Sequence, residues 1–111
     1  MAKYVFMFVN DETLRDRPKP EVDAVYADIA RWSKDLEKRG VLKSGLELQR
    51  KDTAMTVRRV GGAMRVSDGP FLETKEHVGG FAMVEVADLD EAIRIAKAFP
   101  GSIEIRPIVE H

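Results

Sequence analysis

The apolar residues of this chain form two continuous runs, one near the start and one near the end. Residues 4–9 are all apolar and rich in aromatic and β-branched side chains, which is typical of a strand buried on both faces. Residues 81–86, which follow Gly79 and Gly80, form a second, mostly apolar strand. We expect these two strands to lie side by side in the middle of one sheet.

Two other segments place apolar residues three and four positions apart, which predicts amphipathic helices. Pro20 suits a first helical turn because it has no N–H to leave unpaired, and Gly40 ends that helix. The second helix starts with Asp88 and Glu91 as a capping box and stops at residues 99–101. One stripe of the first helix faces the sheet, and its aromatic members either join the core or line a pocket there: Val22, Val25, Tyr26, Ile29, Trp32, Ser33 and Leu36.

Shorter segments predict the remaining strands, at residues 41–50, 53–60, 63–67 and 102–107. Gly61 and Gly62 join the second and third of these as a tight hairpin turn, since both can take the positive φ of primed turns. In that register Arg58 lies opposite Arg65. Pro107 cannot donate to a sheet ladder, so the last strand belongs at the rim.

This order of elements predicts a ferredoxin-like α+β sandwich, βαββαβ, with an added β-hairpin. A chain of 111 residues suits a single domain, residues 1–111. Two helices cover only one face of such a sheet, yet the central strands are apolar on both faces. We therefore expect a two-fold homodimer in which the uncovered faces of two sheets meet.

The composition argues against several classes of function. The formal net charge of -1, from 18 Lys and Arg against 19 Asp and Glu, gives no general attraction for nucleic acid or an anionic membrane. The chain has no cysteine and only two histidines, His77 and His111, so we expect no thiol site, no metal site and no cofactor. The first apolar run is too short for a signal peptide or a membrane span, which predicts a cytoplasmic protein.

The most informative segment is residues 68–76, where turn residues, an aromatic ring and four ionisable groups occur together. Together with residues 66–67, 78–81, 89–92 and 103–108, it closely resembles the YCII-related proteins of the DGPF type. The resemblance covers essentially the whole chain. It implies a dimeric α+β barrel of bacterial type, whose members often have no assigned reaction and are in some cases encoded beside or fused to extracytoplasmic-function sigma factors.

The resemblance also implies candidate chemistry, because the wider group includes a dehydrochlorinase and proteins with a proposed His–Asp pair. Here no histidine occurs between Val22 and Trp32, where such a histidine is expected, and Asp68 alone matches the aspartate. Asp68 is either a turn residue that accepts backbone N–H groups or a catalytic base or ligand acceptor at a strand end. Phe71 either packs in the core or covers an apolar pocket.

Four consecutive polar residues, Thr74, Lys75, Glu76 and His77, are further candidates for ligand binding. Neighbours in an extended segment point to opposite sides, so Thr74 with Glu76, or Lys75 with His77, are the sets that can face one ligand. The alternative is a solvated loop with local hydrogen bonds.

The opposed cations Arg58 and Arg65 are unfavourable across a ladder unless an anion lies nearby. That anion is either a carboxylate of this chain, from Glu47, Glu73 or Glu76, or the carboxylate or phosphate of a ligand. The alternative is that solvent alone screens the two cations.

These features favour a pocket between the sheet and the first helix, closed by residues 68–80, that binds a small anionic or aromatic molecule. Cofactor-free acid–base chemistry is one use of such a pocket, with Asp68 as base and with Tyr26 and Phe71 as walls. Two alternatives stay open: a non-catalytic ligand-binding or regulatory module that works with a sigma factor, and a structural dimer without a ligand.

Overall fold

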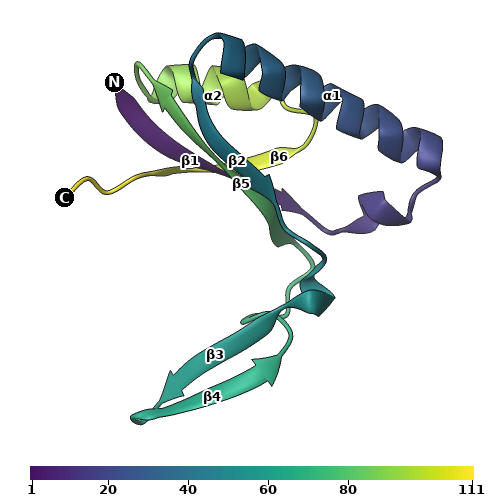
Figure 1. Ribbon diagram of the computed structural model, residues 1–111, viewed down its shortest axis with the longest axis vertical. Coiled ribbons are helices and arrows are strands. Elements are labelled where there is room, and N and C mark those ends of the chain that lie inside the picture. The colour runs from purple at the N-terminus through teal and green to yellow at the C-terminus, as the bar shows by residue number, and fades with distance from the viewer.

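The computed structural model describes all 111 residues and contains a four-stranded antiparallel sheet, two helices on one of its faces and a separate hairpin (Figure 1). The sheet has the order β2-β5-β1-β6. Its strands are β1 (Ala2–Asn10), β2 (Leu42–Glu47), β5 (His77–Val86) and β6 (Ser102–Pro107). The helices are α1 (Lys19–Lys38) and α2 (Leu89–Lys97), the hairpin strands are β3 (Met55–Val60) and β4 (Ala63–Asp68), and two short 3-10 helices are η1 (Thr13–Asp16) and η2 (Lys51–Thr53). The predicted ferredoxin-like α+β fold is confirmed.

The two most apolar strands are central, as the sequence predicts. β1 and β5 pair over their whole lengths, from Ala2 opposite Val86 to Asn10 opposite His77. β6 pairs only with β1 and forms one rim of the sheet, which confirms the place that Pro107 predicts. No helix of the structure is both long enough and apolar enough to cross a membrane.

β5 begins earlier than expected, because its first residues do not read as a strand. The sequence suggests a start at Phe81, whereas the strand starts at His77 and includes two glycines. The reason is a close approach of backbones: a Cβ added to Gly80 would lie 2.5 Å from the carbonyl oxygen of Leu46 on β2. Glycine there permits strand pairing, although it looks like a strand breaker. Two strands are shorter than predicted: β2 ends at Glu47 and the first hairpin strand, β3, starts at Met55.

The core lies between the helices and one face of the sheet. Trp32 of α1 is anchored there, since its indole N–H donates to the carbonyl oxygen of Ile95 on α2 at 3.0 Å. Aromatic rings continue the core toward η1, with Phe8 and Phe99 at a centroid distance of 4.8 Å. The fully packed residues are Phe6, Trp32, Leu36, Val41, Ala82, Val84, Val86, Ala92 and Ile95.

The other face of the sheet has no helix over it (Figure 1). Side chains of β1 and β5 alternate between the two faces, so the register that buries Phe6 and Val84 turns their neighbours to this side. We call this surface the open face; it is formed by Val5, Met7, Leu46, Phe81 and Met83. Leu46 is 59% exposed and Phe81 37% exposed, so one chain leaves an apolar surface in contact with solvent.

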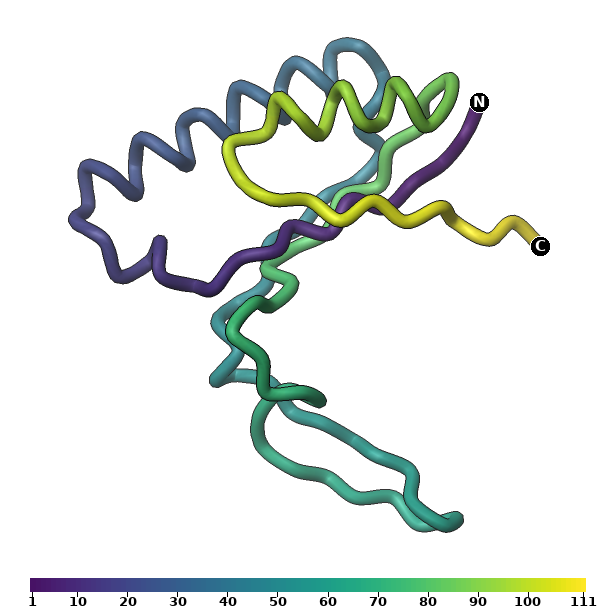
Figure 2. Tube along the Cα trace, turned by 180° about the vertical axis from the view of Figure 1, so that it is seen from behind, coloured from purple at the N-terminus to yellow at the C-terminus, as the bar shows by residue number.

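The hairpin projects from the end of the sheet on the side away from the helices (Figures 1 and 2). Its predicted register is confirmed, with Arg58 opposite Arg65 and positive φ angles of 54° at Gly61 and 85° at Gly62. The projection makes the chain extended: its radius of gyration is 16.2 Å, against about 13 Å for a compact chain of this length.

Candidate functional site

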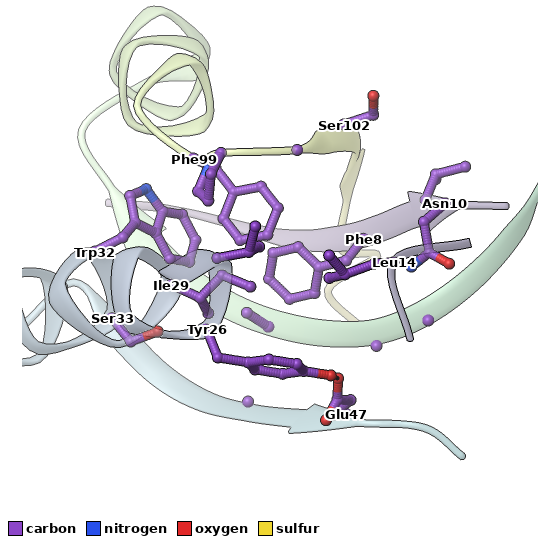
Figure 3. Close-up of a pocket in the computed structure, with 18 of the residues that line it drawn as sticks. Phe8, Asn10, Leu14, Tyr26, Ile29, Trp32, Ser33, Glu47, Phe99 and Ser102 are labelled. Carbon is purple, nitrogen blue, oxygen red and sulfur yellow. Dashed lines mark hydrogen bonds between the residues drawn. The ribbon is translucent and has the colours of Figure 1, made fainter. Parts of the chain in front are cut away.

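A pocket of about 550 Å³ lies between α1 and the sheet, at the end where β1 leads into η1 (Figure 3). The first half of α1 overhangs it with Val25, Tyr26 and Ile29, which are half-buried. The same apolar stripe continues into the core at Trp32 and Leu36. The predicted stripe therefore has two uses: its carboxyl half packs against the sheet, and its amino half forms the roof of the pocket.

Three aromatic rings form the inner wall of the pocket (Figure 3). Trp32 and Phe99 meet edge to face at a centroid distance of 4.9 Å, and Phe8 meets Trp32 in the same way at 5.9 Å. Such contacts hold aromatic side chains in fixed orientations. The wall is therefore suited to a flat apolar group.

The floor of the pocket is open because the strands carry small residues there. Gly45 of β2 pairs with Ala82 of β5, and Gly80 lies two positions before Ala82 on the same strand. A Cβ added to Gly45 would meet only ordinary contacts, at 3.6 Å from the Phe81 carbonyl oxygen and 3.8 Å from the Ala82 Cβ. A larger side chain at Gly45 would thus fit the backbone and occupy the pocket.

The rim of the pocket is polar and joins α1 to β2. The Tyr26 hydroxyl donates to Glu47 Oε2 at 2.7 Å, and Arg15 Nη2 lies 3.7 Å from the same oxygen. Arg15 also donates to the carbonyl oxygen of Leu48 at 2.7 Å. The hydrogen bond to Glu47, followed by burial and by the charge of Glu47, raises the pKa of Tyr26, so this phenol keeps its proton at neutral pH.

Acidic side chains outnumber basic ones around the pocket. Its lining contains Asp11, Glu12, Glu37 and Glu47, but only Arg15 and Arg17. Hydrogen bonds from Thr13 lower the pKa of Asp11, which keeps that carboxylate ionised. The local charge therefore opposes an anionic ligand. No group of three or more histidine, aspartate or glutamate side chains is placed to hold a metal ion.

Of the site residues predicted from the sequence, Tyr26 alone lines this pocket. The predicted loop does not close over the pocket within one chain, because the segment between β2 and β5 pairs with itself as a hairpin and leads away from α1 (Figure 1). Only Gly79 and Gly80, at the start of β5, reach the pocket. The residues that lie outside it are Arg58, Arg65, Asp68, Phe71, Thr74, Lys75, Glu76 and His77.

Arg58 finds an aromatic partner in place of the expected anion. Its guanidinium lies 3.9 Å from the centroid of the Phe71 ring and donates to the Phe71 carbonyl oxygen at 3.3 Å. This cation–π contact holds the Arg58 side chain against the loop after β4. Phe71 is 57% exposed, so it is not part of the core.

The side chains of Thr74 and of His77, the first residue of β5, bond to backbone within the same short segment. Thr74 Oγ1 donates to the carbonyl oxygen of Glu76, and His77 Nε2 contacts the carbonyl oxygen of Thr74, both at 2.5 Å. At the start of the loop the turn is closed by main-chain groups, since the N–H of Gly69 donates to Ala54 O at 2.8 Å. Asp68 itself is exposed at the end of β4.

Two residues of the polar rim, Glu47 and Arg15, were not predicted from the sequence to line the pocket. Glu47 lies two positions after Gly45 on β2, so both face the pocket by strand alternation. The two-residue spacing shows from the sequence that Gly45 and Glu47 share a face of β2. It indicates a pocket only once α1 is known to cover that face. Arg15 belongs to η1, whose position no periodicity predicts.

Comparison with known proteins gives two matches that each cover nearly all of the chain. The family model described as the YCII-related domain matches residues 2–111. An uncharacterised protein of Rhizobium meliloti (strain 1021) is 35% identical over 112 residues, which cover 95% of this chain and 90% of that protein.

Proposed function

We propose that this chain, which belongs to the YCII-related family, binds a small neutral aromatic molecule in the pocket between α1 and the sheet. One observation carries the proposal: the same pocket, of about 550 Å³, has an aromatic wall at one end and the Tyr26–Glu47 pair at the other. Pockets of roughly 300–1,000 Å³ with few polar groups are typical of small-molecule sites.

The rim favours a ligand that carries an O–H or N–H group. The Tyr26 hydroxyl donates its hydrogen to Glu47, so the pair has only hydrogen-bond acceptors left for the pocket. These are the Tyr26 oxygen and the remaining lone pairs of the carboxylate. A ligand carboxylate would instead meet like charge. Of the anionic and aromatic ligands expected from the sequence, we therefore favour the aromatic class.

Glu47 is also the group in the pocket best placed for acid–base chemistry. It is a carboxylate at the mouth, and Tyr26 fixes one of its oxygens. In this proposal Glu47 takes the proton-accepting role that the sequence suggested for Asp68, and Tyr26 positions it.

The open face supports the expected homodimer. Val5, Met7, Leu46, Phe81 and Met83 form one apolar surface that a monomer leaves in water. Pairing of two such surfaces about a two-fold axis removes both from solvent. We propose this assembly for the protein in solution.

Calorimetric titration with phenol and with benzoate tests the ligand class. Phenol, a neutral aromatic donor, is expected to bind more tightly than the anion benzoate. Gly45→Val is expected to abolish phenol binding, because its side chain fills the floor, whereas Ser44→Val, on the opposite face of the same strand, leaves it unchanged. Equal affinity for the two compounds would contradict the ligand class, and phenol binding that survives Gly45→Val would contradict the site.

A further inference from the structure

The β3–β4 hairpin lacks the support that a two-stranded ribbon needs. Its strands pair only with each other and form a sheet of their own. Isolated two-stranded hairpins are marginally stable in water, and packing against another layer is what usually stabilises them. The extended shape of the chain shows that this layer does not come from its own body.

The two faces of the hairpin differ in character. The register places Met55, Val57, Met64 and Val66 on one face, and they are 60%, 55%, 52% and 64% exposed. We call these four residues the arm stripe. Arg59 and Asp68 share this face, opposite Met64 and Met55. Its four large apolar side chains are each more than half exposed, which suits them to burial in an interface.

The loop after β4 packs against the other face of the hairpin. There Thr56 is buried and donates to the carbonyl oxygen of Gly69 at 2.7 Å, and Arg58 lies over Phe71. The loop thus fixes the base of the hairpin through its polar face and leaves the arm stripe uncovered. Within one chain the polar face of the hairpin is covered and the arm stripe is exposed, whereas apolar side chains are usually the buried ones.

We infer that the hairpin is an arm that reaches across to a second copy of the chain, where the arm stripe packs on the margin of the partner's open face, at Leu46 and Phe81, beside the contact between the two sheets. The inference rests on the homodimer proposed above and adds its second contact. The hairpin leaves the sheet on the side of the open face, away from the helices (Figure 1). Two-fold symmetry then lets each arm cover the partner while the partner's arm covers it.

The size of the two surfaces fits a second copy. Two strands of six residues make a ribbon about 20 Å long and, with side chains, about 10 Å wide. The open face adds a patch about 15 Å wide across three strands and about 10 Å long. Together they supply a substantial part of the roughly 800 Å² per partner that a stable dimer buries. A net charge of -1 adds little repulsion between copies.

Sedimentation equilibrium of a variant that makes the arm stripe charged tests the inference. Val57 and Val66 oppose each other, so Val57→Lys with Val66→Glu gives a cross-strand ion pair that preserves the hairpin. The dimer dissociation constant is expected to rise by roughly 100-fold or more, since two charges must be desolvated on docking. The matched control, Val60→Lys with Ala63→Glu, places the same pair on the other face and is expected to leave the dissociation constant within about threefold.

The outcomes separate the two proposals. Dissociation constants of weak, transient contacts are on the order of 100 micromolar. A wild-type protein that stays monomeric at that concentration overturns both the homodimer and the arm. A wild-type dimer whose dissociation constant is unchanged in the Val57/Val66 variant overturns the arm alone. Because the chain has no cysteine, a mixture of Val66→Cys and Phe81→Cys chains provides a second readout: a disulfide between the two chains supports the arm, and its absence in a confirmed dimer contradicts it.

Discussion

The hydroxyl of Tyr26 on α1 donates a hydrogen bond of 2.7 Å to Glu47 on β2, and this contact joins the roof of the pocket to the edge of its floor. It is the direct polar link between the first half of α1 and the sheet, which otherwise face each other across the pocket (Figure 3). It also fixes what the pocket offers to a ligand, because a carboxylate with one oxygen engaged presents its other oxygen in a defined direction.

Tyr26→Phe removes that link while it keeps the apolar ring. We expect the affinity for phenol to fall by roughly 10-fold, because Glu47 loses the donor that orients it. The free energy of unfolding should change by only about 1 kcal/mol, since the bond lies at a solvated rim. Calorimetry and urea denaturation measure the two effects. The matched control is Tyr4→Phe in β1, which lies outside the pocket and should leave phenol affinity unchanged; an equal loss in both variants would contradict the role of Tyr26.

The raised pKa of Tyr26 predicts a particular pH dependence of stability. The folded state favours the neutral phenol, so the stabilisation is complete below the ordinary pKa of 10.0 and is lost as pH rises through the higher folded pKa. Urea denaturation of the wild type should therefore show a steeper fall in unfolding free energy above pH 10 than Tyr26→Phe. Parallel curves for the two proteins would show that Glu47 does not hold the phenol proton.

Trp32 provides an internal probe, because it is the single tryptophan of the chain and lines the pocket. Phenol bound against the aromatic wall should change its fluorescence in a saturable manner. In Gly45→Val the signal should stay constant over the same titration, while Ser44→Val should behave as the wild type. A saturable change in Gly45→Val would place the ligand elsewhere.

The contact between Arg58 and Phe71 should stabilise the base of the hairpin. Phe71→Leu removes the ring and is expected to cost about 0.5–1 kcal/mol of local stability, the usual size of an exposed cation–π contact. Hydrogen exchange of the β3 and β4 amides measures this. In the double variant with Arg58→Gln the loss should not add to that of Arg58→Gln alone, and full additivity would mean that the two side chains do not interact.

The sequence was sufficient for the parts of the fold that depend on periodicity. The continuous apolar runs predicted that β1 and β5 are central, and Gly61 and Gly62 predicted the hairpin and its register. The stripe on α1 was equally visible, but spacing alone does not tell whether a neighbour fills the space opposite. Leu36 is buried in the core, whereas Ile29 lines the pocket and Trp32 belongs to both.

The position of the loop residues could not be predicted, because it depends on where a whole segment points. Asp68 and Thr74 were recognised by local chemistry, but the connection between β2 and β5 folds on itself and leads them away from α1. Pocket residues such as Glu47 come instead from strand positions beside glycine, where the open floor results from a missing side chain.

A crystal structure of the protein grown with phenol tests the central claim most directly. We predict an aromatic ring between α1 and the sheet, in contact with Phe8, Trp32 and Phe99, with its hydroxyl within hydrogen-bonding distance of Glu47. A ring bound beside Asp68 on the hairpin loop, with the pocket under α1 holding only water, would contradict the account.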